Sequence, residues 1–236
     1  MNGIGDFIYT ESKPLPVILL LDTSKSMSKN DNIGTLNKAV YEMVNSLKTS
    51  SGNEASVQIT VITFGEETGV QIPLQDVNKI NQPFKLKARG GTFMAKAIDI
   101  AKSIIEDKEM IPSRSYRPIV IMVTDGAPGD NWRLAMNKFI NEGRSSKCFR
   151  MAMGIGNGAE GISKEVLETF VSSKEYLFSA NNAGEISGFF QFATMTAQKS
   201  IPKPAVQDQQ SKEEKKAVEL SEDEGGNDYL GDLILY

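Results

Sequence analysis

The chain has 236 residues, of which 40% are apolar and 24% charged, and its formal net charge is -4. This composition is that of an ordinary globular protein with a large core, and the lack of a dense Lys/Arg block argues against DNA or RNA as a partner. With no histidine and one cysteine, the sequence excludes Ser-His-Asp and Cys-His nucleophile systems, the commonest zinc sites and an intrachain disulfide, so a bound metal must be held by oxygen.

Two further features bear on location and core. The longest apolar run, Leu15 to Leu21, is far shorter than the roughly 20 residues of a bilayer span, and the N-terminus lacks the charged start and apolar stretch of a signal peptide. We therefore expect a cytoplasmic protein with no membrane partner. Cys148 lies in the strand-like run CFRMAMGIG, where a cysteine fills core space.

Apolar runs typical of strands alternate with stretches of helical period. In chain order we expect a strand at 17–21, a helix at 33–47, a strand at 56–64 with a short hairpin partner at 70–74, a helix at 94–106, a strand at 119–123, a helix at 132–141, a strand at 149–155, the Gly-rich turn GIGNGAEG, a helix at 164–171, a strand at 176–178 and a helix at 183–196. This alternation predicts the α/β class, a Rossmann-like, doubly wound, mainly parallel six-stranded sheet with one antiparallel edge strand and helices on both faces.

The composition changes at the two ends of the chain. We expect residues 1–13 to be an N-terminal extension, 14–200 to form one domain, and 201–236 to be a polar, acidic tail that closes with the apolar segment YLGDLILY. The apolar end predicts docking on the domain, docking on a partner or self-association, with a loosely packed end as the alternative. One hypothesis is that the tail supplies a carboxylate to a metal site in the same chain or a neighbouring copy, from Glu219, Glu222, Asp223 or Glu224.

Two of the expected strands end in an aspartate. Asp22 follows the apolar run of VILLLDTSKSMS, and Asp125 follows that of IVIMVTDG. In open parallel α/β sheets the ligand site lies beyond the carboxyl ends of the strands, where the strand order reverses. If these two strands are neighbours at that point, both carboxylates emerge on one edge of the sheet.

Hydroxyl groups accompany the two carboxylates. Ser24 and Ser26 are two residues apart, so an extended loop turns both inward, and Gly90-Gly91 suits a backbone of positive φ or close approach that brings Thr92 over the site. Two close carboxylates need a cation between them, and Mg²⁺ fits two Asp with neutral hydroxyls better than Ca²⁺ does, with Mn²⁺ or Ca²⁺ as alternatives. The candidate metal ligands are Asp22, Ser24, Ser26, Thr92 and Asp125.

Each motif also has a purely structural interpretation. The DTSKS segment is compatible with a helix N-cap region, with Ser28, Asn30 or Asp31 as the capping residue. The sequence TDG alone is a turn after a strand, and GGT alone a flexible loop. The combination of the three motifs at strand ends of one α/β domain favours the metal site.

Residues after the TDG motif have their own alternatives. Trp132 and Arg133 are candidates for an aromatic and a cationic contact at the rim of the metal site, whereas packing at a helix start is the favoured role for Trp132. Asp130 and Asn131 are expected to cap that helix.

On these residues the chain resembles von Willebrand factor type A domains. DTSKS at 22–26, Thr92 in GGTFMAKAI and Asp125 in IVIMVTDG are similar to the metal-ion-dependent adhesion site of that family, with every motif position filled. The forms GGTFM and TDGAPGDNW resemble the bacterial stress-response branch typified by the tellurium-resistance TerY-like proteins.

The resemblance implies a role for each residue. Ser24 and Ser26 bind the metal directly, Thr92 does so in the ligand-competent state, and Asp22 and Asp125 act mostly through water. An Asp or Glu of a protein partner then fills the open metal position. Relatives in the TerY-like branch are associated with a protein kinase and a PP2C-type phosphatase, so a scaffold for such a signalling complex is implied.

The rival hypothesis is an enzyme that uses Asp22 as a nucleophile, either a Mg-dependent phosphatase or a phosphoacceptor domain of the α/β class. The phosphatase pattern requires a second Asp two residues later as the acid/base, and Ser24 holds that position. Receiver domains need an early acidic pair and a later Lys, neither of which is in place. The sequence therefore favours a binding module over an enzyme, and a purely structural protein is the third class.

Overall fold

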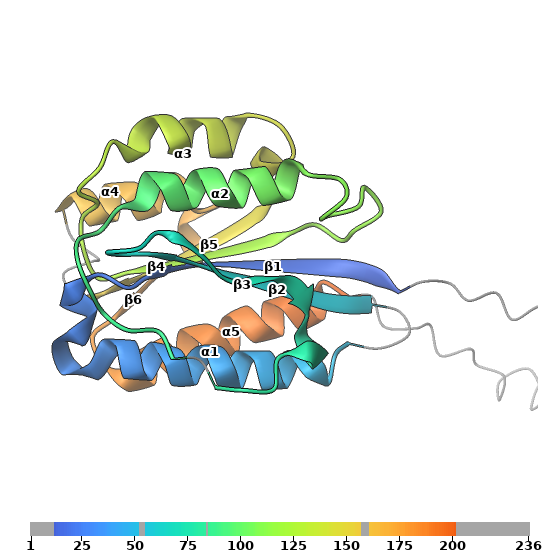
Figure 1. Cartoon of the computed structure of the whole chain (residues 1–236), viewed down its shortest axis with the longest axis horizontal. Coiled ribbons are helices and arrows are strands. Elements are labelled where there is room, and N and C mark those ends of the chain that lie inside the picture. The colour runs from blue at the N-terminus through green and yellow to red at the C-terminus, as the bar shows by residue number, and fades with distance from the viewer. Residues whose placement is uncertain (1–11, 52–54, 84, 157–160, 202–236) are drawn as a thin grey trace, which may run out of the picture. The chain divides into compact units, whose positions relative to one another are not determined.

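Six strands form one sheet in the order β3-β2-β1-β4-β5-β6 (Figure 1). The computed structural model describes residues 12–51, 55–83, 85–156 and 161–201. The strands are β1 (Lys13–Asp22), β2 (Ala55–Phe64), β3 (Gly69–Asp76), β4 (Ile119–Thr124), β5 (Phe149–Ile155) and β6 (Leu177–Ala180). All neighbouring pairs are parallel except β2 and β3, which pair antiparallel at the edge, so the predicted fold class is confirmed.

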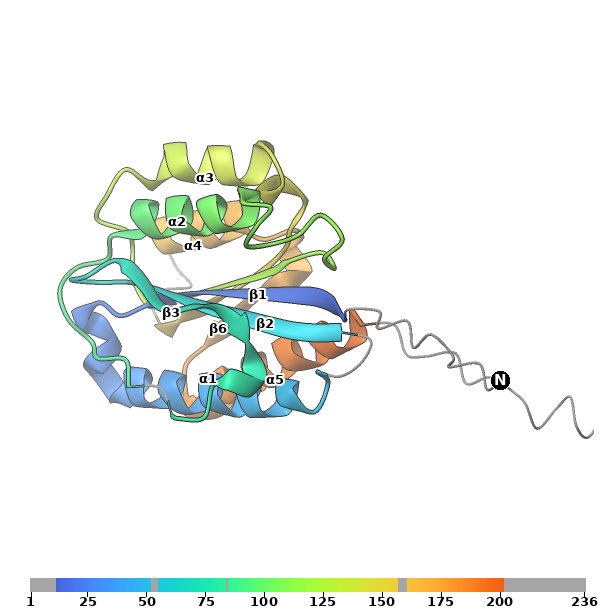
Figure 2. The same cartoon turned by 45° about the vertical axis from the view of Figure 1, so that its right-hand side comes forward.

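Helices cover both faces of the sheet (Figures 1 and 2). On one face lie α1 (Asn32–Lys48) and α5 (Ala183–Lys199), and on the other lie α2 (Met94–Glu106), α3 (Trp132–Asn141) and α4 (Gly161–Phe170). Short 3-10 helices are η1 (Lys25–Asp31), η2 (Val77–Lys79), η3 (Ser145–Lys147) and η5 (Lys174–Tyr176). Within the described ranges, no helix is long and apolar enough to cross a membrane.

The central strand β1 explains the unbroken apolar run of the sequence. Leu19 and Leu21 belong to the core under α1 and α5, whereas Ile18 and Leu20 belong to the core under α2, α3 and α4. Since successive residues of a strand point to opposite faces, a strand covered on both sides must be apolar at every position. Cys148 is fully buried in the second core, as predicted.

The start of β1 lies earlier than the predicted 17–21, because Pro14 and Pro16 are part of the strand. The carbonyl of Pro14 accepts a hydrogen bond from the Tyr116 backbone N–H on the β4 side. A residue's N–H and C=O point the same way in a strand, so the missing N–H of Pro14 also faces that side. There β4 pairs with β1 only from Val17 onward, so the proline removes no ladder hydrogen bond.

Other predicted elements differ in their limits. The helix predicted at 164–171 begins at Gly161, and the last helix continues to Lys199 rather than residue 196. The Gly-rich turn predicted at GIGNGAEG lies partly outside the described residues. The predicted N-terminal extension (1–13, apart from its last two residues) and the tail beyond residue 201 also lie outside them.

Glu106, at the end of α2, fastens the loop before β5. Its carboxylate accepts hydrogen bonds from the backbone N–H groups of Arg144 (2.9 Å) and Ser145 (3.1 Å) and from Lys102 Nζ (3.2 Å). Gly143 has φ +68°, and a side chain there would overlap the carboxylate. Partial burial raises the pKa of Glu106, but these hydrogen bonds and the Lys102 charge outweigh that effect, and the pKa falls from 4.5 to about 2.

We predict that Glu106→Gln destabilises the fold at neutral pH and much less in acid. A carboxyl group whose folded pKa is depressed stabilises above its unfolded pKa of 4.5 and loses that contribution as the pH falls towards 2. With the side chain 33% exposed, screening limits the loss at pH 7 to about 1 to 2 kcal/mol. Urea unfolding at pH 7 and pH 2.5 measures it, with the exposed Glu109→Gln as control. A loss of equal size at both pH values would contradict the assignment.

Candidate metal centre

The carboxyl ends of β1 and β4 lie side by side, where the strand order reverses. Leu21 pairs with Val123, so the residues that follow each strand emerge at the same level of the sheet. The chain goes from β1 to β2 on one side, and β4 adds on the other side. This is the place where open α/β sheets bind ligands.

Asp22 is fully buried at this junction. Its carboxylate accepts hydrogen bonds from the Ser24 backbone N–H (2.7 Å) and from Thr124 Oγ1 (2.5 Å). Burial raises the pKa of Asp22 to about 6, against the opposing effect of the Ser24 and Thr124 hydrogen bonds, and the nearby Asp125 raises it further. A buried carboxylate in this state favours either a proton or a cation beside it.

A chain of oxygen atoms links the first loop to the second aspartate. Ser24 Oγ and Ser26 Oγ are 2.9 Å apart, and Ser26 Oγ donates to Asp125 Oδ1 at 2.6 Å. Burial also raises the pKa of Asp125, while the Ser26 hydrogen bond and the Lys29 charge lower it. The hydroxyls therefore point inward, as their spacing predicts.

The Gly-Gly-Thr loop closes the third side of the site. The Lys25 backbone N–H donates to the carbonyl of Gly90 (2.9 Å), and that of Gly129 donates to the carbonyl of Thr92 (2.8 Å). A Cβ atom on Gly126 would lie 3.6 Å from Thr92 Oγ1 and 3.9 Å from Ser26 Oγ, so both hydroxyls face this glycine.

The predicted need for glycine before Thr92 holds at Gly90. This residue has φ +68°, and a Cβ atom there would lie 2.6 Å from the Cα atom of Glu66. Both the left-handed backbone and the close approach exclude a larger residue. The conformation sets the direction in which the loop enters the site.

The structure thus brings the predicted ligands to one place. The set consists of two carboxylates and three hydroxyls, from Asp22, Asp125, Ser24, Ser26 and Thr92. Among the described residues no group of three or more His, Cys, Asp and Glu side chains gathers anywhere, so the site is rich in hydroxyls rather than in acids. All-oxygen donors with one buried and one partly buried acid fit a hard divalent cation such as Mg²⁺.

The predicted capping of α3 by Asp130 and Asn131 is wrong, and the capping alternative at the start of α1 is not observed. Asp31 and Asn131 stand at the N-cap positions of α1 and α3, and neither makes a side-chain capping bond. Ser28 donates to the Lys25 carbonyl instead (2.8 Å). Asp130 accepts from the backbone N–H of Ala95 (2.8 Å), so it binds the start of α2 rather than α3.

The predicted rim residues divide as follows. Trp132 is 3% exposed and packs in the core under α2, α3 and α4, which confirms packing at a helix start. Arg133 lies over the Trp132 ring and pairs with Glu165 at 2.9 Å. Its guanidinium is therefore already engaged.

The sequence interpretation missed Thr124. This buried residue donates to Asp22 and accepts a hydrogen bond from the Gly126 backbone N–H (3.2 Å). It thereby joins the end of β1 to the loop after β4. The signal was present in the hydroxyl residue directly before Asp125, at the last position of an otherwise apolar strand.

Comparison with known proteins identifies similar folds. The sequence model of the von Willebrand factor type A domain family matches residues 17–192. A search of curated proteins gave no match. Among solved structures, proximal thread matrix protein 1 from the mussel byssus, with a zinc-occupied MIDAS motif, is 19% identical with a TM-score of 0.56, over 80% of this chain and 46% of that one.

Two bacterial pilus proteins are also similar. The vWF domain of the pilus tip protein Mfa5 from Porphyromonas gingivalis is 13% identical with a TM-score of 0.61, over 84% of this chain and 99% of that one. The pilus adhesin SpaC from Lactobacillus rhamnosus GG is 14% identical with a TM-score of 0.62, over 80% of this chain and 30% of that one. This chain spans less than half of the mussel and SpaC proteins, and at these identities the likeness concerns the fold.

We predict that Asp22→Asn stabilises the metal-free protein at neutral pH. A carboxyl group whose folded pKa is raised from 3.8 to about 6 costs stability as the pH rises through this window, and the full cost remains above it. Removing the charge regains up to about 3 kcal/mol at pH 7 and nothing below pH 4. Thermal unfolding in excess chelator at both pH values measures this, with the exposed Asp99→Asn as control. A variant less stable than wild type at pH 7 would contradict the prediction.

Proposed function

The chain belongs to the von Willebrand factor type A domain family, and we propose that it is a protein-interaction module that binds an acidic side chain of a partner through a divalent cation. The observation that carries this proposal is the convergence of Ser24, Ser26 and Thr92 with only two carboxylates on one edge of the sheet. Hydroxyl ligands leave a cation's charge largely uncompensated. A partner's carboxylate is the natural ligand for such an ion.

Each residue has a role in this proposal. Ser24, Ser26 and Thr92 supply direct oxygen ligands, and Asp22 and Asp125 hold the hydroxyls and cation-bound water through their carboxylates. Supporting evidence for this division is that Ser26 is already hydrogen-bonded to Asp125 and that Asp22 is fully buried. When bound, the cation supplies a positive charge that attracts an anionic side chain.

Mg²⁺ is the proposed ion, with Mn²⁺ or Ca²⁺ as alternatives. The small number of carboxylates supports Mg²⁺, because Ca²⁺ sites in proteins usually carry more of them. The mussel byssus protein holds zinc at its MIDAS motif, so a comparison of ions belongs in any binding experiment.

We further propose a place in bacterial stress-response signalling. The forms GGTFM and TDGAPGDNW support membership of the tellurium-resistance TerY-like branch. The proposed setting is a cytoplasmic complex with a protein kinase and a PP2C-type phosphatase, in which the domain acts as a scaffold. Pull-down of such partners from the native host with Mg²⁺ and with EDTA tests this, and equal recovery in both would contradict metal-mediated docking.

We predict that Ser26→Ala weakens Mg²⁺ or Mn²⁺ binding about tenfold or more, because it removes a proposed ligand and the hydrogen bond to Asp125. The matched control is Ser28→Ala, two residues further along, whose hydroxyl donates to the Lys25 carbonyl rather than to the site. Isothermal titration calorimetry measures both variants and Asp22→Ala.

Two outcomes would overturn the proposal. Absence of metal-dependent heat in the wild type removes the metal centre and leaves a structural protein. Turnover of a generic phosphate ester that is lost in Asp22→Asn favours the phosphatase instead. The buried position of Asp22 and the serine at position 24 argue against that outcome.

A further inference from the structure

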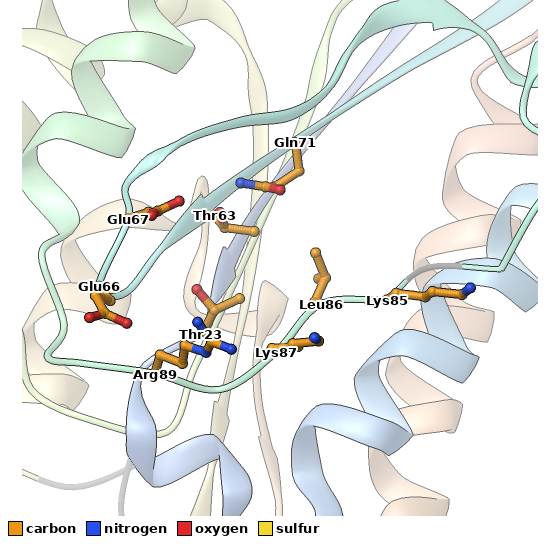
Figure 3. Close-up of a pocket in the computed structure, with 9 residues that line it drawn as sticks. All are labelled: Thr23, Thr63, Glu66, Glu67, Gln71, Lys85, Leu86, Lys87 and Arg89. Atoms are coloured by element: carbon orange, nitrogen blue, oxygen red, sulfur yellow. The ribbon is translucent and has the colours of Figure 1, made fainter.

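A polar pocket of about 280 Å³ lies next to the candidate metal centre (Figure 3). Thr23, which stands between two proposed metal-site residues in the chain, lines it together with Thr63 from the end of β2. The turn after β2 contributes Glu66 and Glu67 to one side, and the segment 85–89 forms the facing side. The pocket and the metal centre therefore share the loop that follows β1.

Three cationic side chains line the facing side of this pocket, and we call Lys85, Lys87 and Arg89 the cation row. All three are exposed, whereas the intervening Leu86 and Ala88 are partly buried and pack against the core under α1 and α5. This alternation is the pattern of an extended chain. It places successive cations about 6.5 Å apart along one side.

Hydrogen bonds from three other parts of the chain hold the backbone of this segment. The Asn37 side chain of α1 both donates to the Leu86 carbonyl and accepts from its N–H, each at 2.9 Å. The Arg89 N–H donates to the Thr23 carbonyl (2.7 Å), and the Arg89 carbonyl accepts from the Glu66 N–H (3.0 Å). The backbone that carries the cation row is thus held in place before any partner arrives.

The cationic groups themselves are not used by the fold. Within the described ranges, the side chains of the cation row have no hydrogen bond or ion pair, and neither do Glu66 and Glu67 across the pocket. Other guanidinium groups of the domain serve the structure instead. Those of Arg117, Arg144 and Arg150 donate to backbone carbonyls, and that of Arg133 pairs with Glu165.

We propose that the cation row binds a second acidic side chain of the partner, so that the partner presents an extended acidic segment with carboxylates at alternate positions. This inference rests on the proposed function, because one carboxylate of the segment binds the cation while another enters the pocket. An extended peptide repeats its side chains on one face every two residues. That repeat matches the spacing of the cation row.

The opposite side of the pocket narrows the choice of partner. Glu66 and Glu67 face the entering chain with negative charge, which repels a continuous polyanion such as a nucleic acid. The same carboxylates accept hydrogen bonds from the N–H groups of a peptide backbone. A protein segment with separated acids satisfies both sides of the pocket.

Labelled synthetic peptides of equal length test the proposal by fluorescence anisotropy in Mg²⁺. One peptide has three Glu at alternate positions separated by Ser, one has three adjacent Glu, and one has a single Glu. We expect the alternating peptide to bind about three- to tenfold more tightly than the other two. Lys87→Ser/Arg89→Ser should remove this advantage and leave calorimetric Mg²⁺ binding unchanged.

The control removes the same charge elsewhere. Lys138→Ser/Lys199→Ser changes two exposed cations on α3 and α5, and it should keep the preference for the alternating peptide. Equal affinity of the wild type for the three peptides would overturn the proposal for the cation row. So would an equal loss, in both double variants, of the preference for the alternating peptide. Binding of a single-stranded oligonucleotide that is tighter than that of the alternating peptide, and that is lost in Lys87→Ser/Arg89→Ser, would overturn it in favour of nucleic acid.

The two proposals fail in different ways. If the single-Glu peptide binds only with Mg²⁺ and additional acids add nothing, the metal centre stands and the cation row is refuted. If the alternating peptide binds equally in EDTA and to Asp22→Ala but not to Lys87→Ser/Arg89→Ser, the cation row stands and the proposed function is refuted.

Discussion

The hydrogen bond between Thr124 and Asp22 joins the two strands on which the candidate site depends. Asp22 lies at the end of a strand that is buried on both faces, so its carboxylate has no access to solvent and needs partners from the protein. Thr124 on the adjacent strand and the Ser24 backbone provide them. Because β1 and β4 are neighbours in the sheet, this contact joins residues about a hundred positions apart in the sequence. The same pairing brings Ser24 and Ser26, after β1, close to Asp125, after β4.

Local signals were sufficient to predict the sheet and to predict which oxygen-bearing side chains gather at its edge. An apolar run that stops at an acid marks the carboxyl end of a buried strand, and such ends meet at one edge in a parallel sheet. A different local rule, N-cap preference, failed at Asp130, which accepts a hydrogen bond from the Ala95 N–H of α2 rather than from its own helix. N-cap preferences describe a residue's neighbours in sequence, whereas this bond depends on how the loop before α3 packs against the start of α2.

The conformation of the cation row could not be predicted from the local sequence either. In the sequence, KLKARGG at 85–91 carries alternate cations, but nothing local distinguishes a fixed extended segment from a solvated loop. The order comes from Asn37, Thr23 and Glu66, which lie in α1, after β1 and after β2. Gly90 then turns the chain through a left-handed conformation, so that one segment supplies both the cation row and the approach to Thr92.

The positive charges near the candidate site differ in sign from the net charge of the chain. A chain with a net charge of -4 repels an acidic partner at long range. At the edge of the sheet that holds the candidate site, however, exposed Lys25 and Lys29 accompany the cation row, and the proposed divalent ion would add its charge to theirs. Positive charge is therefore concentrated locally, beside Glu66 and Glu67, and in the proposal it attracts an acidic segment to this edge. Such a field acts mainly on encounter and orientation, and in the proposed function the oxygen atoms of the candidate metal centre then determine which carboxylate remains bound.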